Sequence, residues 1–342
     1  MTASLEKKTA YLDHNFLDKL SKGYWLEFFG YIRDNYRVVY SDATLKEIKR
    51  SGLGAPRFID ALCFLEAEHI RIILTDEFDS TNFAYYTSLS PKDVFSEYCE
   101  NLSSIYEGIE ESTIKSLLKM YGGLNGVGFE EINKYQKNSF SELVNDLSEK
   151  NNEIREINPD VYEKIKNRTS GFQESFDAAL AQSSEHMKKY VSDDLGFSGV
   201  QTYRSEVEIT PKILNNIKPP NVIEKIFDLY KRVDDYKNFS IEQFLGISWN
   251  EIYKREMHTH EKIRAIYNLL NFIGYVSDSN MKKERRLVAA MSDADHAAMA
   301  SFIDVLFSLD EKFVIKTEAV YEYLGCHTKV AKITFHKQQA DN

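Results

Sequence analysis

The sequence predicts an α/β protein in which helices cover both faces of a parallel β-sheet. Near both ends of the chain, short runs of β-branched and aromatic residues, such as RVVYS and IRIILTD, alternate with amphipathic stretches. Continuous apolar runs separated by helices are typical of parallel strands that are buried on both faces. The middle of the chain instead has apolar residues at three- and four-residue intervals, a spacing typical of helices with one buried face.

Both ends of the chain supply elements of the predicted sheet. Residues 9–75 contain the expected strands TAYLD, RVVYS and IRIILTD, separated by helical patterns that include FLDKL, YWLEFFGYI, DATLKEIKR and RFIDALCFLEAEHI. Residues 293–335 are expected to form a helix, a strand, a helix and a strand, in the order DADHAAMASFI, DVLFSLD, EKFVIKTEAVYEYLG and TKVAKITF. Each end is too short to bury a sheet alone, so we expect the two ends to combine.

The central segment is expected to be an all-helical insertion in this α/β domain. Residues 1–79 and 287–342 would form the discontinuous domain, and residues 80–286 the insertion. GGLNGVG and the segment around Pro219-Pro220 are the main loop signals within it. Three serial domains are the alternative organisation.

The composition favours a soluble, cytoplasmic protein. The chain has 342 residues, of which 43% are hydrophobic, and no run approaches the roughly 18 apolar residues of a membrane helix. Its three cysteines lie far apart, which argues against a disulfide framework or a zinc site and fits a reducing compartment. The net charge of −10 argues against indiscriminate binding to nucleic acid, although it allows a local basic groove.

Acidic residues recur at equivalent places, where a strand ends or the next helix begins. They are Asp13 after TAYL, Glu47 in the helix after RVVYS, Asp293 at the start of DADHAAMASFI, and Asp310 after DVLFSL. The carboxyl ends of the strands in an open α/β sheet form the crevice where ligands bind. We therefore expect these carboxylates to gather in a small volume, as the catalytic and metal-binding residues.

Crowded carboxylates raise each other's pKa, and a divalent cation relieves their repulsion. Mg²⁺ and Mn²⁺ prefer carboxylate oxygens, and such an ion can activate a water and neutralise charge on a phosphoryl oxygen. This chemistry indicates hydrolysis of phosphodiester bonds. A structural alternative is strongest at SDAD, because Ser292 is suited to cap a helix and Asp295 to complement its dipole. Asp295 would cap the helix, assist the metal, or do both.

These motifs resemble those of PIN-domain nucleases, a family of metal-dependent ribonucleases that includes the VapC-type toxins. In family order, the similar segments are YLDHN, YSDATLKEIKR, SDADHAAMA and DVLFSLDEKF. The resemblance covers the two chain ends and implies a PIN-like sheet, with Mg²⁺ or Mn²⁺ as cofactor and the four acids as its ligands. The central segment has no counterpart in compact family members. A toxin-like or defence role is also only an implication of the resemblance.

Basic residues close to the acidic motifs are the expected substrate contacts, because nucleic-acid phosphates are bound mainly by lysine and arginine. They are Lys46, Lys49 and Arg50 beside Glu47, and Lys282, Lys283, Arg285 and Arg286 before the third motif. Asn15, His296 and Ser308 are expected to support the acids, and His296 would orient a carboxylate or a water.

The sequence thus predicts a Mg²⁺- or Mn²⁺-dependent endonuclease that cleaves RNA, with DNA as an alternative substrate. The other alternative is a catalytically inactive PIN-like scaffold whose helical insertion binds a protein or a nucleic acid. A protein partner or inhibitor would bind through that insertion, and no membrane partner is expected. The oligomeric state is left open, with a homo-oligomer as one alternative.

Overall fold

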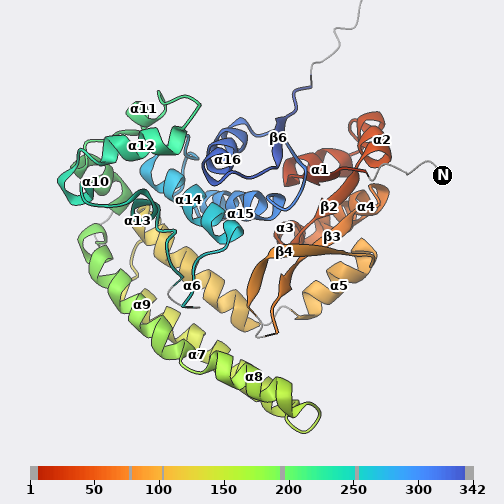
Figure 1. Cartoon of the computed structure of the whole chain (residues 1–342), viewed down its shortest axis with the longest axis horizontal. Coiled ribbons are helices and arrows are strands. Elements are labelled where there is room, and N and C mark those ends of the chain that lie inside the picture. The colour runs from red at the N-terminus through yellow and green to blue at the C-terminus, as the bar shows by residue number, and fades with distance from the viewer. Residues whose placement is uncertain (1–6, 77–78, 102–103, 193–196, 251–253, 336–342) are drawn as a thin grey trace, which may run out of the picture.

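A computed structural model of the chain describes residues 7–76, 79–101, 104–192, 197–250 and 254–335. Its centre is a six-stranded sheet in the order β4-β3-β2-β1-β5-β6, parallel except for the antiparallel pair of β3 and β4. The strands are β1 (Thr9–Leu12), β2 (Arg37–Tyr40), β3 (Glu68–Leu74), β4 (Ser80–Thr87), β5 (Val305–Ser308) and β6 (Lys329–Lys332). The predicted α/β class is confirmed, and strands from both chain ends lie side by side in one sheet (Figure 1).

Helices connect and cover these strands. The α-helices near the N-terminus are α1 (His14–Ser21), α2 (Leu26–Asn35), α3 (Asp42–Arg50), α4 (Ala55–Phe64) and α5 (Pro91–Asn101). Those of the central segment are α6 (Ser104–Met120), α7 (Phe129–Glu153), α8 (Pro159–Thr169), α9 (Phe172–Met187), α10 (Gly199–Glu206), α11 (Pro211–Leu214), α12 (Val222–Tyr230), α13 (Ile241–Leu245) and α14 (Thr259–Ile273). The last two are α15 (Glu284–Ala300) and α16 (Glu311–Leu324), and short 3₁₀ turns lie at η1 (Gly52–Gly54), η2 (Lys188–Tyr190) and η3 (Asp234–Tyr236).

The sheet separates two hydrophobic cores, because successive residues of a strand point to opposite faces. On one face Leu12 and Phe307 pack with residues of α1 to α5. On the other face Tyr11 and Leu306 pack with residues of α10 and of α12 to α16. Strands β1, β2 and β5 are therefore buried on both sides, as their continuous apolar sequences predict.

Two expectations from the sequence are corrected by the structure. Residues 80–286 are not helical throughout, because 80–87 form β4, the antiparallel edge strand of the sheet. The helix expected to begin at Asp293 begins at Glu284, because Leu287 and Ala290 continue its apolar side and pack in a small cluster with residues of α6. Ser292 consequently lies inside α15 and does not cap a helix.

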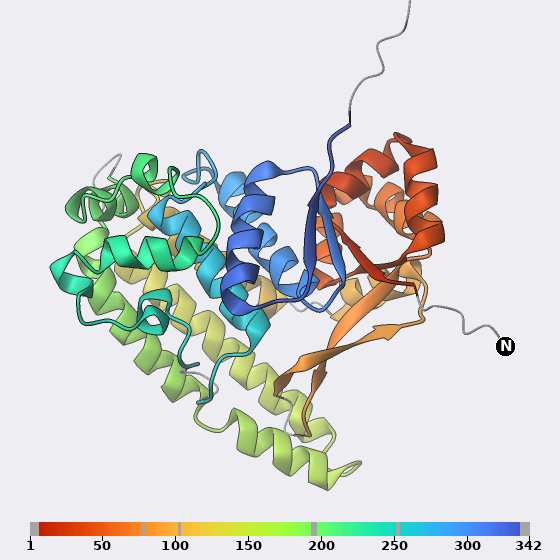
Figure 2. The same ribbon diagram turned by 45° about the horizontal axis from the view of Figure 1, so that its top comes forward.

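The central helices differ in how they relate to the sheet. Helices α10 and α12 to α14 share one hydrophobic core with β1, β2 and β5, and α14 packs against both α15 and α16. Helix α7 instead packs on α6, helices α8 and α9 pack on α7, and these helices extend along the edge of the molecule (Figures 1 and 2). Part of the predicted insertion thus belongs to the core that supports the sheet.

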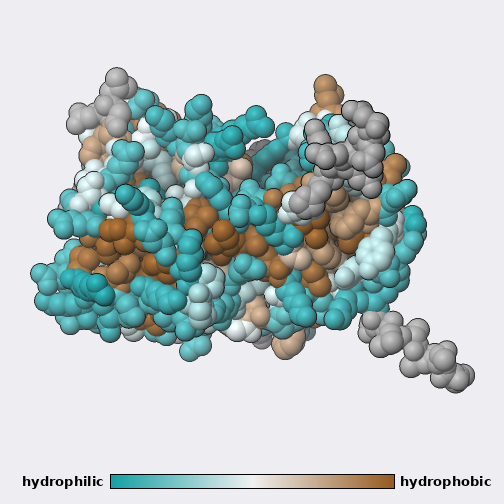
Figure 3. All heavy atoms as spheres, turned by 90° about the horizontal axis from the view of Figure 1, so that it is seen from above, coloured by the Kyte–Doolittle hydropathy of each residue, from teal (hydrophilic) through white to brown (hydrophobic). Residues whose placement is uncertain are grey.

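Most of the visible surface is hydrophilic, although apolar groups form an interrupted band across the face seen from above (Figure 3). Large exposed apolar residues include Tyr24, Leu26 and Tyr31, which are 52–58% exposed around α2. Among the described residues, no helix combines the length and the apolar character needed to cross a membrane.

Candidate active site

Asp13 lies at the carboxyl end of β1, where it caps helix α1. Its backbone N–H donates to the carbonyl of Phe307 in β5 at 3.2 Å, which ties the turn to the neighbouring strand. One carboxylate oxygen accepts from the Phe16 N–H at 3.0 Å, and the other accepts from the Ser308 hydroxyl. Burial raises the pKa of Asp13 to about 6, although both donors favour its charged form. A buried carboxyl group with a raised pKa is typical of functional sites.

Glu47 extends from α3 towards Asp13 and is held by three side chains. The Ser292 hydroxyl donates to one carboxylate oxygen at 2.7 Å. His296 Nε2 and His14 Nδ1 lie 3.1 and 3.2 Å from the other oxygen. Burial opposes charge on Glu47, but the two imidazoles and the hydroxyl outweigh it and hold the pKa of Glu47 at about 2. Glu47 is therefore ionised at neutral pH.

His296 connects Glu47 to the buried end of β1. Its Nδ1 lies 2.7 Å from the Tyr11 hydroxyl, which also lies 2.7 Å from Ser41 Oγ and 3.2 Å from Thr44 Oγ1. Burial disfavours charge on the imidazole, but Tyr11 and Glu47 raise the pKa of His296 well above its ordinary value. His296 and Glu47 thus form a buried ion pair between α15 and α3, across 249 residues of sequence.

Asp293 and Asp310 belong to a second acidic group at the same edge of the sheet. Asp310 caps α16, and its carboxylate accepts from the N–H groups of Lys312 and Phe313 at 2.8 and 3.1 Å. Asp293 lies in α15, where burial raises the pKa of its carboxyl group well above the ordinary value. Lys316 opposes this shift, which places a positive charge beside Asp293.

The ammonium group of Lys316 is enclosed by this second group. Lys316 is 0% exposed, and its Nζ donates to Asn271 Oδ1 at 2.7 Å and to Asp278 Oδ2 at 3.0 Å. The same nitrogen lies 4.5 Å from the centre of the Tyr267 ring, within the range of a cation–π interaction. The Tyr267 hydroxyl is buried near Asp293 and lacks a hydrogen bond of normal geometry.

The four predicted acids therefore lie as two pairs. Electrostatic interactions link Asp13 with Glu47 and Asp293 with Asp310, and His296 interacts with an aspartate of each pair. Among the described residues, no group of three or more histidine, cysteine, aspartate or glutamate side chains is close enough together to hold a metal ion. The sequence predicts the shared edge of the sheet, whereas the side-chain positions divide the acids between two neighbouring groups.

Several other predicted site residues have partners outside these two groups. Asp295 points towards α14 and forms an ion pair with Arg264 at 2.7 Å, so it is directed away from the other acids. Lys46 and Arg50 both pair with Glu110 of α6, the first at 2.8 Å. Their positive charges are therefore matched by a carboxylate at the place where substrate phosphates were expected.

Of the remaining predicted residues, one supports the acids through hydrogen bonds, and the others lie at or near the surface. Ser308 is fully buried and links the Asp13–Glu47 pair to the Asp293–Asp310 pair. Its hydroxyl donates to Asp13 and accepts from the Asp310 N–H at 3.0 Å. Asn15 is exposed in the first turn of α1, and Lys49 is half-buried on α3. The basic residues just before and within the first turn of α15 are all exposed, and the structure shows no ion pair for them within its described ranges; they are Lys282, Lys283, Arg285 and Arg286.

Sequence reasoning missed three residues of the site. His14 directly follows Asp13 in YLDHN, and Tyr11 precedes it by two positions, so both lay inside a motif already singled out. Lys316 shares a helical face with Phe313 and Val320, three residues before it and four after it, and both of these are buried. That spacing was the available signal that this lysine points inward.

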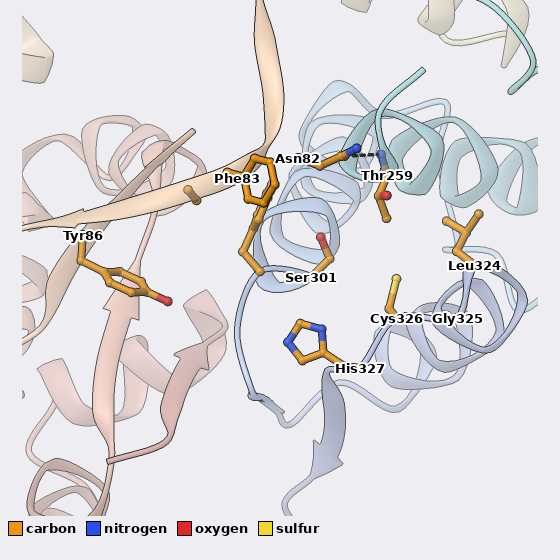
Figure 4. A pocket seen from close by; sticks show the side chains of 11 residues that line it. Asn82, Phe83, Tyr86, Thr259, Ser301, Leu324, Gly325, Cys326 and His327 are labelled. Atoms are coloured by element: carbon orange, nitrogen blue, oxygen red, sulfur yellow. Dashed lines mark hydrogen bonds between the residues drawn. The ribbon is translucent and has the colours of Figure 1, made fainter. Parts of the chain in front are cut away.

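A cavity lies away from these acids, and none of the four predicted acids lines it. It has a volume of about 410 Å³ and lies between β4, the N-terminus of α14 and the carboxyl ends of α15 and α16. Asn82, Thr259, Ser301 and His327 line it, and the Asn82 side chain accepts from the Thr259 N–H at 2.9 Å (Figure 4). Ser301 and His327 precede β5 and β6, so the cavity is at the amino edge of these parallel strands, whereas the acids are at the carboxyl edge.

The fold and the site define an α/β protein with buried acidic groups at the carboxyl edge of a mostly parallel sheet. No protein-family model, curated protein or solved structure matches the chain. The functional argument therefore depends on the residues themselves.

Proposed function

We propose that this protein is a Mg²⁺- or Mn²⁺-dependent endoribonuclease of the PIN type. The observation that best supports it is the pair of buried carboxylates, Asp13 and Glu47, at the edge of a parallel sheet where ligands bind. The motif resemblance at both chain ends supports the same activity.

Carboxylate oxygens are the ligands that a hard divalent cation prefers. Asp13 and Glu47 would hold the ion, and Asp293 and Asp310 complete the acidic edge that attracts it. The raised pKa of Asp13 supports this assignment, because a nearby positive charge would stabilise its carboxylate. When bound, the ion supplies a water of lowered pKa and neutralises charge on a phosphoryl oxygen.

The chain's own residues would fix the geometry of this carboxylate pair. Ser308 and the Phe16 N–H hold Asp13, while Ser292 and His296 hold Glu47. Such supporting hydrogen bonds orient ligands and restrict their rotamers. His14 is the more exposed of the two imidazoles against Glu47, with 26% of its side chain exposed. It is therefore the one that would face an incoming phosphate.

Exposed lysines and arginines at the start of α15 would contact the backbone of the RNA. Lys46 and Arg50 would also contact the RNA, by exchanging their ion pairs with Glu110 for ion pairs with phosphate groups. The central helices would shape access to the site or recruit a protein partner. The unpaired cysteines fit a cytoplasmic protein, and a toxin-like or defence role would follow from cleavage of cellular RNA.

The test is cleavage of labelled RNA, with a DNA of the same sequence alongside, in Mn²⁺, in Mg²⁺ and with a chelator. We expect metal-dependent cleavage by the wild type and none by Asp13→Asn, with unchanged circular dichroism. Asp295→Asn is the matched control and should retain cleavage, because Asp295 pairs with Arg264. Equal cleavage by Asp13→Asn would refute the assignment. Cleavage of the DNA alone would identify DNA, and not RNA, as the substrate.

A second candidate, a metal-independent ribonuclease, is favoured by the histidines on either side of Glu47, because paired imidazoles are common acid–base catalysts. Its distinguishing result is cleavage that survives the chelator and is lost in His14→Gln. An inactive scaffold would show neither cleavage nor binding of Mn²⁺.

A further inference from the structure

The cavity beside β4 has no part in the proposed nuclease site, and its lining suits a ligand of its own. Its volume of about 410 Å³ falls in the range of roughly 300–1,000 Å³ that small-molecule sites occupy. Segments that are far apart in the sequence form its walls: β4, the start of α14, the end of α15, and the end of α16 with the residues before β6. A cavity of about 150 Å³ already holds a benzene ring, so this one has room for a pair of fused rings.

The hydrophobic core fixes one side of the cavity. Several of its lining residues pack against the core that α10 and α12 to α16 share with the sheet; they are Ala84, Tyr86, Phe302, Leu324 and Cys326. The Arg37 guanidinium lies 4.2 Å from the centre of the Tyr86 ring, a cation–π contact that restrains this ring. A site built on packed residues is largely pre-formed, so a ligand can bind it with little ordering of the protein.

Aromatic rings line the cavity, and one of them is left largely in water. Figure 4 shows the rings of Phe83 and His327 on either side of Ser301. Phe83 is 71% exposed, although contact between a phenyl ring and water is unfavourable. A flat aromatic ligand would cover this ring by stacking on it, a contact that contributes about fivefold or more in affinity for a nucleobase.

The cavity also offers hydrogen-bond donors and acceptors. The Asn82 amide oxygen accepts from the Thr259 N–H at 2.9 Å, which leaves the amide NH₂ of Asn82 as a donor. Ser301 donates its hydroxyl to the Ala298 carbonyl at 2.7 Å, which leaves the hydroxyl oxygen as an acceptor. Donors and acceptors side by side are what the edge of a nucleobase presents, so these groups match such an edge.

The charge of the lining restricts the ligand further. Among the described residues, the eleven that line the cavity include no lysine, arginine, aspartate or glutamate. A protonated His327 has its own counter-charge in Asp304, with which it interacts electrostatically. An ionised ligand would give up its hydration here without gaining a counter-charge, which is unfavourable. The lining therefore favours a neutral ligand over an anionic one.

We propose that this cavity binds a neutral nucleobase or its nucleoside, with the base stacked on Phe83 and its polar edge towards Asn82 and Ser301. The cavity is at the amino edge of β5 and β6, and the acids are at the carboxyl edge. The inference therefore goes beyond the proposed nuclease activity and does not depend on it.

Calorimetric titration with each ribonucleoside measures binding, and Phe83→Ser tests the stacking ring. Phe83 is exposed, so its loss should leave the fold intact. We expect saturable binding to the wild type and an affinity at least about fivefold lower in Phe83→Ser. Tyr85→Ser is the matched control, because Tyr85 is an exposed aromatic residue of the same strand that does not line the cavity. For this control and for Asp13→Asn we expect a change of less than about twofold, since both residues lie outside the cavity.

Further ligands test the chemistry of the site. Ribose carries the sugar without the base, and urate is a purine that is anionic at neutral pH. We expect no binding of ribose, and binding of urate at least about fivefold weaker than that of the best nucleoside. A short single-stranded RNA distinguishes a free base from one in a polynucleotide, because tighter binding of the RNA that Phe83→Ser removes would keep the base site and assign it to a strand.

Several results would overturn the inference. They are the absence of binding by every nucleoside, equal binding by Phe83→Ser, loss of binding in Asp13→Asn, and binding of ribose or urate as tight as that of the nucleoside. None of them bears on metal-dependent cleavage of RNA, which is measured separately.

Discussion

Replacing Asp13 by asparagine should stabilise the metal-free protein at neutral pH. Asparagine has the same shape, is an equally good helix cap, and keeps an oxygen to accept from the Phe16 N–H. Its amide nitrogen takes the place of the oxygen that accepts from the Ser308 hydroxyl, and Ser308 Oγ can accept from it instead. The substitution also removes the charge, which burial makes unfavourable in the folded protein. A substitution expected to abolish the proposed metal binding would in this way raise stability.

The pKa of Asp13 sets the size of the effect. Its folded value of about 6 exceeds the model value of 3.8 by roughly 2 units, so the charge costs about 3 kcal/mol above pH 6. Because the folded carboxyl group binds a proton more tightly than the unfolded one, this cost is absent below pH 4. It grows as the pH rises to 6, where it becomes constant. Asp13 is 4% exposed, so solvent screening reduces the figure little.

Urea unfolding of both proteins with a chelator, from pH 4 to pH 7.5, measures the difference directly. We expect Asp13→Asn to unfold at higher urea by up to about 3 kcal/mol at pH 7.5 and to match the wild type near pH 4. Asp310→Asn is the matched control, since Asp310 also caps a helix after a strand, and we expect a change of less than about 1 kcal/mol. A difference that is independent of pH, or a less stable Asp13→Asn, would refute the reasoning.

Further predictions concern the Glu47 ion pair and the central helices. Glu47→Gln should lower the free energy of unfolding by about 3 kcal/mol at pH 7, because it leaves the buried His296 imidazolium without its partner, and urea unfolding would measure this. The stability that Glu47 provides, present above its unfolded pKa of 4.5, should be lost as the pH falls towards 2, and a Glu47→Gln pH series should lack that loss. Ile266→Ala in α14 should cost about 2–5 kcal/mol in the same unfolding transition, since Ile266 is fully buried in the core shared with the sheet; a separate transition would contradict this.

The strands were largely predictable because their sequences meet the physical demands of burial on two faces. RVVYS and DVLFSL are continuous apolar runs, and their residues alternate between the two cores. STNFAYYT, which forms β4, is an edge strand with exposed Phe83 and Tyr85, so it lacks that pattern. The start of α15 was mistaken because SDAD has the composition of a helix cap, and only packing against α6 shows that the helix begins earlier.

The site was predictable to the level of an edge of the sheet and no further. Strand order places Asp13, Glu47, Asp293 and Asp310 on that edge, and topology rules alone give this result. Which side chains then touch depends on rotamers and on partners from other elements. Asp295 turns to Arg264, which nothing in its residue type indicates, and Lys316 turns inward, which only its helical spacing from Phe313 and Val320 indicates.

The network around His296 explains why distant parts of the chain must assemble before the site exists. His296 from α15 joins Tyr11 of β1 to Glu47 of α3, and none of these contacts forms within a single local segment. Each buried polar group would be costly if its partner were missing, so the contacts stabilise one another. The acidic edge should therefore form in the same cooperative step as the sheet, and α15 must dock before Glu47 is held. Since α15 packs on both α14 and α6, the central helices contribute to the geometry of Glu47 through α15 without touching it.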